Sequence, residues 1–175
     1  MVNNYYLIRK GGITMEIFNL ALSMELDLEK FYRGQAELND ENSLKVVFTL
    51  LANEEKNHAK LLGDNANKLS LSLEDSHILS EVQPIFKNIA NFTSNIKDLP
   101  DQLDIYRMAL EKEQQSLKFY KELHVDATEE KTKTVFEYLA KQEEKHCVIL
   151  EELIKLLTRP EEWVESAEFS VREEY

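Results

Sequence analysis

Apolar side chains recur at steps of three and four residues in four separate stretches of the chain, the spacing that gathers them on one face of an α-helix. These stretches predict helices over residues 15–38, 44–69, 99–126 and 129–157. The first two and the last two are each joined by a short polar link, and short links favour antiparallel neighbours. The sequence therefore predicts an all-α protein built as an antiparallel four-helix bundle.

The connection between the second and third helices is long. The periodic pattern fades between Ser70 and Ser80, and a moderately apolar segment from about Val82 to Phe92 favours a separate short helix around or after Pro84. A long crossover of this kind lets the second pair of helices run in the required direction beside the first pair.

The start of the chain differs from the bundle. Residues 1–14 show no helical periodicity and include the string Arg-Lys-Gly-Gly just ahead of Met15. A purine-rich ribosome-binding site encodes this string when it is read in frame. We therefore expect residues 1–14 to be a disordered or mis-started leader, and Met15 to be the natural start.

The end of the chain is acidic. Thr158 and Glu161, with Pro160 between them, fit a capping box that opens a helix. The sequence therefore predicts a four-helix bundle over residues 15–157, followed by an acidic C-terminal tail with a short helix over residues 158–175.

One helical pair is present twice in the chain. The string from Phe48 to His58 recurs from Phe136 to His146, at an offset of 88 residues. If the repeat is real, the segments ahead of each copy should match at the same offset. Three pairs of residues do so: Glu25 and Glu113, Phe31 and Phe119, and Tyr32 and Tyr120.

Each copy of the repeat contains a Glu-x-x-His motif, Glu55 with His58 and Glu143 with His146. Residues three apart on a helix are neighbours one turn along, so both side chains can reach a single point. Both motifs lie within an apolar stripe, where an unpaired carboxylate carries a penalty of several kcal/mol. These side chains therefore need a partner that neutralises them.

Metal ions are the partner that this set of residues favours. Glu25 and Glu113 lie at matching depth on the other two helices, and four carboxylates brought together require protons or cations between them. Two metal ions, each with one terminal glutamate and one histidine and with two glutamates bridging them, match a known arrangement in helical bundles. The alternative is an ordinary bundle in which these polar residues occur by coincidence.

Composition limits the classes of function. The chain has 175 residues, a formal net charge of −12 and no basic cluster, which disfavours nucleic-acid binding. Its one cysteine, Cys147, excludes an internal disulfide and a metal site of four cysteines, and a reducing cytoplasm fits best. Because no apolar run approaches the length of a membrane span, we expect no membrane association.

The helices and paired motifs resemble the ferritin-like superfamily, and within it the rubrerythrin-like and bacterioferritin-like proteins. The resemblance covers about residues 15–157. It implies a ferritin-like antiparallel bundle with the long crossover between helices two and three, and a non-haem di-iron centre. By this resemblance one iron is served by Glu25, Glu55 and His58 and the other by Glu113, Glu143 and His146, with Glu55 and Glu143 as bridges. The ligands alone do not choose between iron, manganese and zinc.

The chain departs from both relatives. Rubrerythrins have a further glutamate at the position of Ser116, so their peroxidase cycle does not carry over whole. The four cysteines of a rubredoxin domain are absent, so a separate electron donor, such as a rubredoxin-like protein, is required. Bacterioferritins carry a methionine for haem at the position of Lys56, so neither haem binding nor a storage cage is favoured.

Four other residues lie near the motifs. Three of them have two possible roles, and the fourth is expected to point away from the candidate ligands. Tyr32 and Tyr120 lie two turns beyond the upstream glutamates, where they either donate hydrogen bonds to ligand carboxylates or only pack in the core. Glu29 is either a seventh ligand or a solvated side chain. Glu54 lies about 100° round the helix from Glu55 and is expected to point elsewhere.

The sequence favours a rubrerythrin-like protein that reduces hydrogen peroxide or dioxygen in oxidative stress and iron homeostasis, because it combines a long crossover with no haem methionine. Ferroxidase activity with iron storage is the alternative. A third interpretation is a non-enzymatic bundle that binds metal for stability or buffering. The resemblance also implies a homodimer that associates through exposed helix faces.

Overall fold

The secondary structure is entirely helical in the computed structural model, which describes residues 15–66, 73–89 and 99–169. This confirms the all-α prediction. In chain order the helices of this part are α2 (Met15–Leu38), α3 (Leu44–Ala66), α4 (Ile78–Ile89), α5 (Leu99–Asp126) and α6 (Glu130–Phe169). The leader predicted over residues 1–14 lies outside the described residues. None of the described helices is long and apolar enough to cross a membrane.

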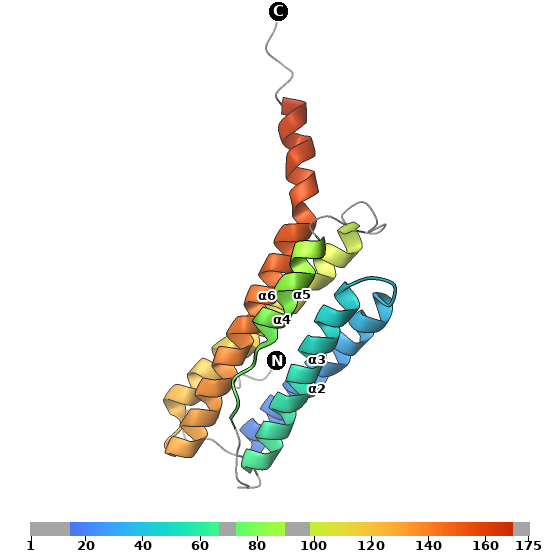
Figure 1. The fold of residues 1–175 in the computed structure, drawn as a ribbon. Coiled ribbons are helices and arrows are strands. Elements are labelled where there is room, and N and C mark those ends of the chain that lie inside the picture. Colours follow the sequence, from blue (N-terminus) through green and yellow to red (C-terminus); the bar gives the residue numbers. More distant parts are fainter. Residues whose placement is uncertain (1–14, 67–72, 90–98, 170–175) are drawn as a thin grey trace, which may run out of the picture.

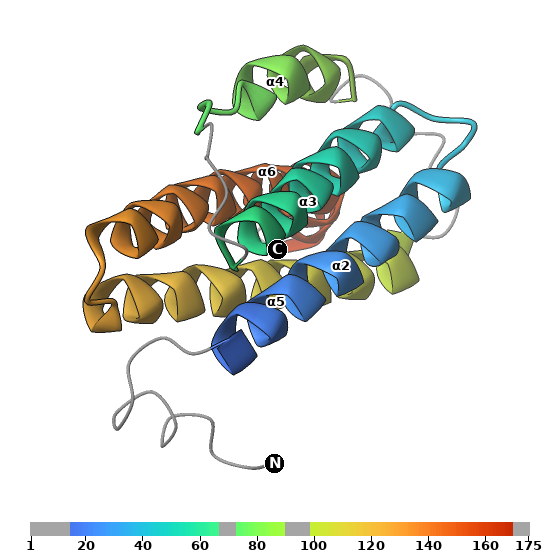
Figure 2. The ribbon, with the colours of Figure 1, turned by 90° about the horizontal axis from the view of Figure 1, so that it is seen from below.

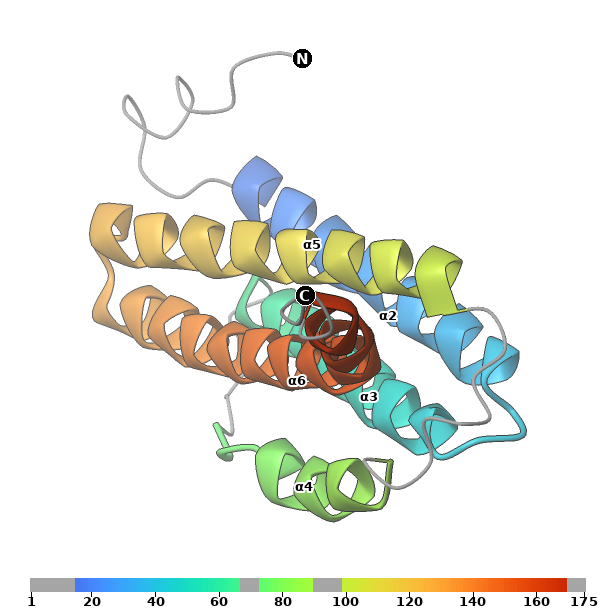
Figure 3. The same cartoon turned by 90° about the horizontal axis from the view of Figure 1, so that it is seen from above.

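The bundle consists of two helical hairpins. Helix α2 packs along α3, and α5 packs along α6, while α4 lies on the outside against α6 and α3 (Figures 2 and 3). Helices α3 and α5 run in the same direction, so the crossover that contains α4 returns the chain to the other end of the bundle (Figure 1). The predicted four-helix bundle with a long crossover is therefore confirmed.

The starts of α3 and α4 are set by side-chain caps. Asn42 Oδ1 accepts a hydrogen bond from the backbone N–H of Leu44 at 2.9 Å, and Ser76 Oγ accepts one from Ile78 at 3.1 Å. The short helix predicted around Pro84 is present as α4, which begins at Ile78 and has Pro84 inside it. Ile78, Val82 and Phe86 share one buried face of α4, and this burial offsets the hydrogen bond that Pro84 cannot donate.

Helix α6 is longer than predicted. The capping box at Thr158 does not form, because the Thr158 hydroxyl donates backwards to the carbonyls of Ile154 at 3.0 Å and Lys155 at 3.3 Å. The helix passes Pro160 and continues to Phe169, and its last turns extend beyond the other helices (Figure 1). The segment after residue 157 is therefore helical to Phe169, as predicted, but as a continuation of α6.

Two hydrophobic clusters occupy the bundle interior, and a polar layer separates them. Along α3, for example, Leu51 and Ala52 belong to the first cluster and Leu61 and Leu62 to the second. Each of the four long helices changes from one cluster to the other at the buried glutamates. This places the polar layer away from both ends of the bundle.

The 88-residue repeat is visible in the aromatic contacts of the core. Tyr32 stacks on Phe48 with ring centroids 6.2 Å apart, and the repeat-related pair Tyr120 and Phe136 stacks with centroids 6.1 Å apart. The interplanar angles are 16° and 19°. The two hairpins therefore place equivalent residues in equivalent surroundings around the polar layer.

Candidate metal centre

Six ionisable side chains from four helices meet in the polar layer, and each is at most 1% exposed. They are Glu25 from α2, Glu55 and His58 from α3, Glu113 from α5, and Glu143 and His146 from α6. Each lies on the buried face of its helix because the sequence places it in register with the apolar positions. The structure thus brings together all six residues that the sequence singled out as candidate ligands.

The six side chains form two overlapping groups, and in each group one potential ligand atom per residue lies within 4.8 Å of the others. The first group is Glu25, Glu55, His58 and Glu143, and the second is Glu55, Glu113, Glu143 and His146. Because Glu55 and Glu143 belong to both groups, their carboxylates lie where they can bridge two cations.

Both histidines direct Nδ1 at this carboxylate cluster. His58 Nδ1 lies 3.1 Å from an oxygen of Glu143, 3.2 Å from one of Glu25 and 3.3 Å from one of Glu55. His146 Nδ1 lies 2.8 Å from Glu55, 3.7 Å from Glu113 and 3.9 Å from Glu143. One ring nitrogen cannot satisfy three carboxylates at once, so the cluster has an excess of acceptor oxygens.

Many of these buried polar atoms have no hydrogen-bond partner among the described residues. They are both oxygens of Glu55 and of Glu143, one oxygen of Glu113, Nε2 of His58, and both ring nitrogens of His146. His146 Nδ1 is close to Glu55 but not aligned for a hydrogen bond. Unpaired buried acceptors are strongly unfavourable, and a cation bound between them would satisfy them. The residues present therefore fit a pair of metal ions.

Burial and mutual repulsion shift the protonation of the cluster. Burial, aided by the charge of Glu55, raises the pKa of Glu25 to about 8, and the same two causes raise the pKa of Glu143 well above its ordinary value. Burial also disfavours the ionised form of Glu55. The charges and hydrogen bonds of His146 and His58 favour that form more strongly, so the pKa of the Glu55 carboxyl is lowered. Burial disfavours the charged form of both histidines, but the hydrogen bonds and charges of the carboxylates favour it more strongly, so the pKa values of His58 and His146 are raised. In the absence of metal the cluster therefore retains protons that a bound cation displaces.

Two tyrosines donate hydrogen bonds to Glu113 and Glu25, the two glutamates that each belong to only one of the groups. Tyr32 on α2 donates its hydroxyl proton to Glu113 on α5, and Tyr120 on α5 donates to Glu25 on α2. Burial, followed by the neighbouring carboxylates, raises the pKa of both phenols well above 10, so both hydroxyls stay protonated. Each tyrosine therefore fixes a carboxylate that belongs to the opposite hairpin.

Three other residues belong to none of the groups of potential metal ligands, namely Glu29, Cys147 and His124. The Glu29 carboxylate accepts hydrogen bonds from Arg33 Nε at 2.9 Å and Nη2 at 2.8 Å on the same helix, and Glu29 belongs to neither group. Burial raises the pKa of the Cys147 thiol to about 12, so this thiol stays protonated at neutral pH. His124 Nδ1 lies 3.0 Å from the carbonyl oxygen of Lys133, away from the cluster.

Sequence reasoning missed Glu54, which we expected to point elsewhere. The structure places it half-buried, with one carboxylate oxygen within 4.8 Å of a ring nitrogen of His58 and of His146. The overlooked signal is the four-residue spacing from Glu54 to His58, because residues at this spacing are neighbours on a helix surface.

The chain is similar to known proteins over most of its length. The family model for rubrerythrin matches residues 16–154, whereas no curated protein matches significantly. Among solved structures, a hypothetical protein from Pyrococcus furiosus superposes with a TM-score of 0.62 at 23% sequence identity, covering 81% of this chain and 88% of that chain. At this identity the structural likeness shows the fold alone, which is that of a ferritin-like helical bundle.

Proposed function

The chain belongs to the rubrerythrin family of ferritin-like di-iron proteins, and we propose that it uses two non-haem iron ions to reduce hydrogen peroxide. The observation that carries this proposal is the pair of overlapping residue groups that share Glu55 and Glu143. A donor set of carboxylates and imidazoles suits iron, and manganese and zinc are the other metals that it fits.

The six side chains divide naturally between two metals. Glu25 and His58 would hold one ion, Glu113 and His146 would hold the other, and Glu55 and Glu143, which belong to both groups, would be shared between them. When bound in the reduced state, the two irons supply the two electrons that break the O–O bond of peroxide, and two protons complete two water molecules. The hydrophobic clusters on both sides of the polar layer exclude bulk water from these residues.

A groove between α2 and α5 offers a small oxidant an approach to this layer. It has a volume of about 350 Å³ and is lined by residues that include Leu28, Phe31 and Ser116. Leu28 lies one turn beyond Glu25 on α2, and Ser116 lies one turn beyond Glu113 on α5. The lining of the groove therefore comes within one helical turn of the two terminal glutamates, which are themselves buried.

The partners in this proposal follow from the same chain. Repeated turnover needs a separate electron donor, such as a rubredoxin-like protein, because the sequence has one cysteine and cannot form a site of four. We also propose that the chain acts as a homodimer, as the family resemblance implies, and that it acts in the reducing cytoplasm, which its single cysteine favours.

Stopped-flow spectroscopy of the reduced, iron-loaded protein tests the proposed reaction. Mixing with hydrogen peroxide should oxidise the iron at least about tenfold faster than mixing with dioxygen, a difference of ~1.4 kcal/mol in activation free energy. Zinc-loaded protein, which cannot change oxidation state, is the control. A faster reaction with dioxygen, with uptake of many irons per chain, would instead support iron storage. If neither hydrogen peroxide nor dioxygen oxidises the iron, the result would support a bundle that binds metal without peroxidase or ferroxidase activity.

The tyrosine hydrogen bonds give a second test. Tyr120→Phe removes the donor to Glu25 without changing the ring, so we expect about tenfold weaker binding of Co²⁺ in a competition titration. Tyr106→Phe is the matched control, because Tyr106 is equally buried but its hydroxyl donates to Gln102 at 3.4 Å and to no candidate ligand. Equal affinities for the two variants would mean that the Tyr120 hydroxyl does not support the site.

A further inference from the structure

The two candidate ligand histidines each have an unused nitrogen. Their Nδ1 atoms face the carboxylate cluster, and both Nε2 atoms are buried without a hydrogen-bond partner among the described residues. The two rings stack with centroids 5.4 Å apart and an interplanar angle of 20°. A histidine that binds metal almost always donates its other N–H to a carboxylate, a backbone carbonyl or water. The pair of stacked rings therefore lacks an acceptor that a metal site of this kind normally has.

Glu54 is the carboxylate that reaches both rings. It lies four residues before His58 on α3, and one of its oxygens lies within 4.8 Å of a ring nitrogen of each histidine. A half-buried glutamate on a helix can change rotamer to close the remaining distance. Its two oxygens can accept one hydrogen bond from each ring.

The internal repeat explains why one glutamate has to serve both histidines. At the 88-residue offset Glu54 corresponds to Gln142, which lies four residues before His146. Gln142 is buried, and its amide nitrogen donates to Asp75 Oδ1 at 3.2 Å while its amide oxygen accepts from Lys145 Nζ at 3.2 Å.

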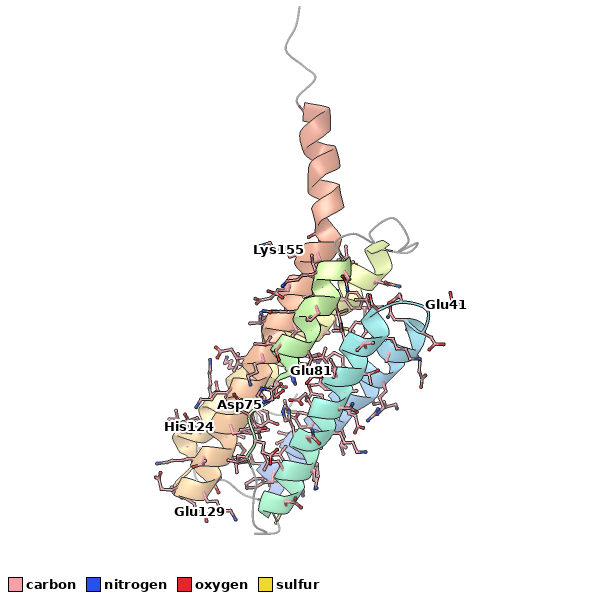
Figure 4. All side chains as sticks on the ribbon, in the orientation of Figure 1. Glu41, Asp75, Glu81, His124, Glu129 and Lys155 are labelled. Atoms are coloured by element: carbon pink, nitrogen blue, oxygen red, sulfur yellow. The ribbon has the colours of Figure 1, made fainter. Side chains whose placement is uncertain are left out.

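The crossover occupies this side of α6. Asp75 lies beside α6, as Figure 4 shows, and it also accepts a hydrogen bond from Lys145 Nζ at 2.6 Å. Tyr138 donates to the carbonyl oxygen of Glu74 at 2.8 Å, which ties a second point of the crossover to the same helix. Both polar ends of the Gln142 amide thus have partners near the crossover, and Glu54 on α3 is the carboxylate outside the two ligand groups that lies near His146.

We propose that Glu54 is a positioning residue whose carboxylate accepts hydrogen bonds from Nε2–H of both His58 and His146, joining the metal ligands of the two hairpins. This inference rests on the proposed metal site. A role for Glu54 as a ligand to a third metal fits less well. A neutral imidazole that binds metal through Nδ1 carries its proton on Nε2 and has no lone pair there.

Zinc-loaded protein provides the test, because zinc is diamagnetic and allows NMR of the histidine rings. In the wild type we expect two zinc ions per chain and slowly exchanging Nε2–H protons on both His58 and His146. Glu54→Ala should make both protons exchange rapidly and weaken zinc binding by about 10–100-fold. Glu54→Gln retains one acceptor oxygen and nearly the same shape, so its affinity should lie between the two.

The matched control is alanine at Glu144, which also neighbours a candidate ligand but has a side chain that is 64% exposed. It should leave both histidine signals and the zinc affinity unchanged. Unchanged exchange at either histidine in Glu54→Ala would overturn the proposal, as would a third zinc that this substitution removes. Thermal unfolding of both Glu54 variants checks that they fold. Wild-type protein that binds no zinc would contradict the proposed function itself, whereas two zinc ions with no effect of Glu54 would contradict only this inference.

Discussion

Alanine at Glu55 or at Glu143 should abolish binding of both metal ions, whereas alanine at Glu25 or Glu113 should weaken mainly one. The reason is that Glu55 and Glu143 each belong to both ligand groups, while the other two glutamates belong to one group each. Loss of a direct ligand should exceed the 10–100-fold effect that is typical of residues that only support ligands. We therefore expect metal content near zero for both bridge variants at micromolar metal.

Metal analysis after loading and desalting measures this directly. Alanine at the exposed Glu144 removes the same charge next to Glu143 and should retain full metal content. Glu143→Ala removes a carboxylate whose charge is disfavoured by burial, whereas Glu55→Ala removes the partner of two histidines, so circular dichroism checks that both variants fold. Undiminished iron in both variants would end the di-iron assignment.

The second large effect is on stability. If each of two metals is present at about a thousand times its dissociation constant, binding contributes ~4 kcal/mol per metal. For a chain of this size, removal of both should lower the melting temperature by roughly 15–30 °C. Circular dichroism with and without chelator measures the change. Magnesium, which prefers an octahedral set of oxygen ligands, should restore little of it. A melting temperature that chelation does not alter would contradict a metal centre in the core.

Stability of the metal-free protein should also fall as the pH rises from about 5 to 8. The folded-state pKa of Glu25 is raised to about 8 and that of Glu143 is also raised, so the stability that their protonated forms contribute is lost over this window. The raised histidine pKa values act in the same direction. The lowered pKa of Glu55 has the opposite effect, because it makes the stability fall as the pH decreases. That loss of stability occurs in acid, below the window considered.

Metal-loaded protein should show the reverse trend, because protons compete with the metal for the same atoms. Melting curves at pH 5.5 and 8, recorded for both forms, separate the two cases. A metal-free form that becomes more stable across this range would contradict the protonated cluster.

The bundle and the six residues of the cluster were predictable from the sequence because both depend on periodicity. A helix has a fixed rise and turn, so the register of Glu55 and His58 with apolar neighbours decides that they face inward. The 88-residue repeat then predicts that Glu143 and His146 occupy equivalent positions, and the structure places them there.

The remaining features depend on contacts that periodicity does not contain. Glu54 lies off the apolar stripe, yet its side chain is long enough to approach the stacked histidines. Pro160 was expected near the start of a helix, but it lies inside α6, just as Pro84 lies inside α4. At Pro84 the buried face of α4 outweighs the local preference, and before Pro160 the Thr158 hydroxyl bonds backwards instead of capping.

Anomalous X-ray diffraction from crystals of the iron-loaded protein tests the central claim most directly, since it locates the metals without reference to activity. We predict two peaks within the polar layer, both adjacent to Glu55 and Glu143, with one beside His58 and the other beside His146. A single peak at this position, or strong peaks only elsewhere on the protein, would contradict the account.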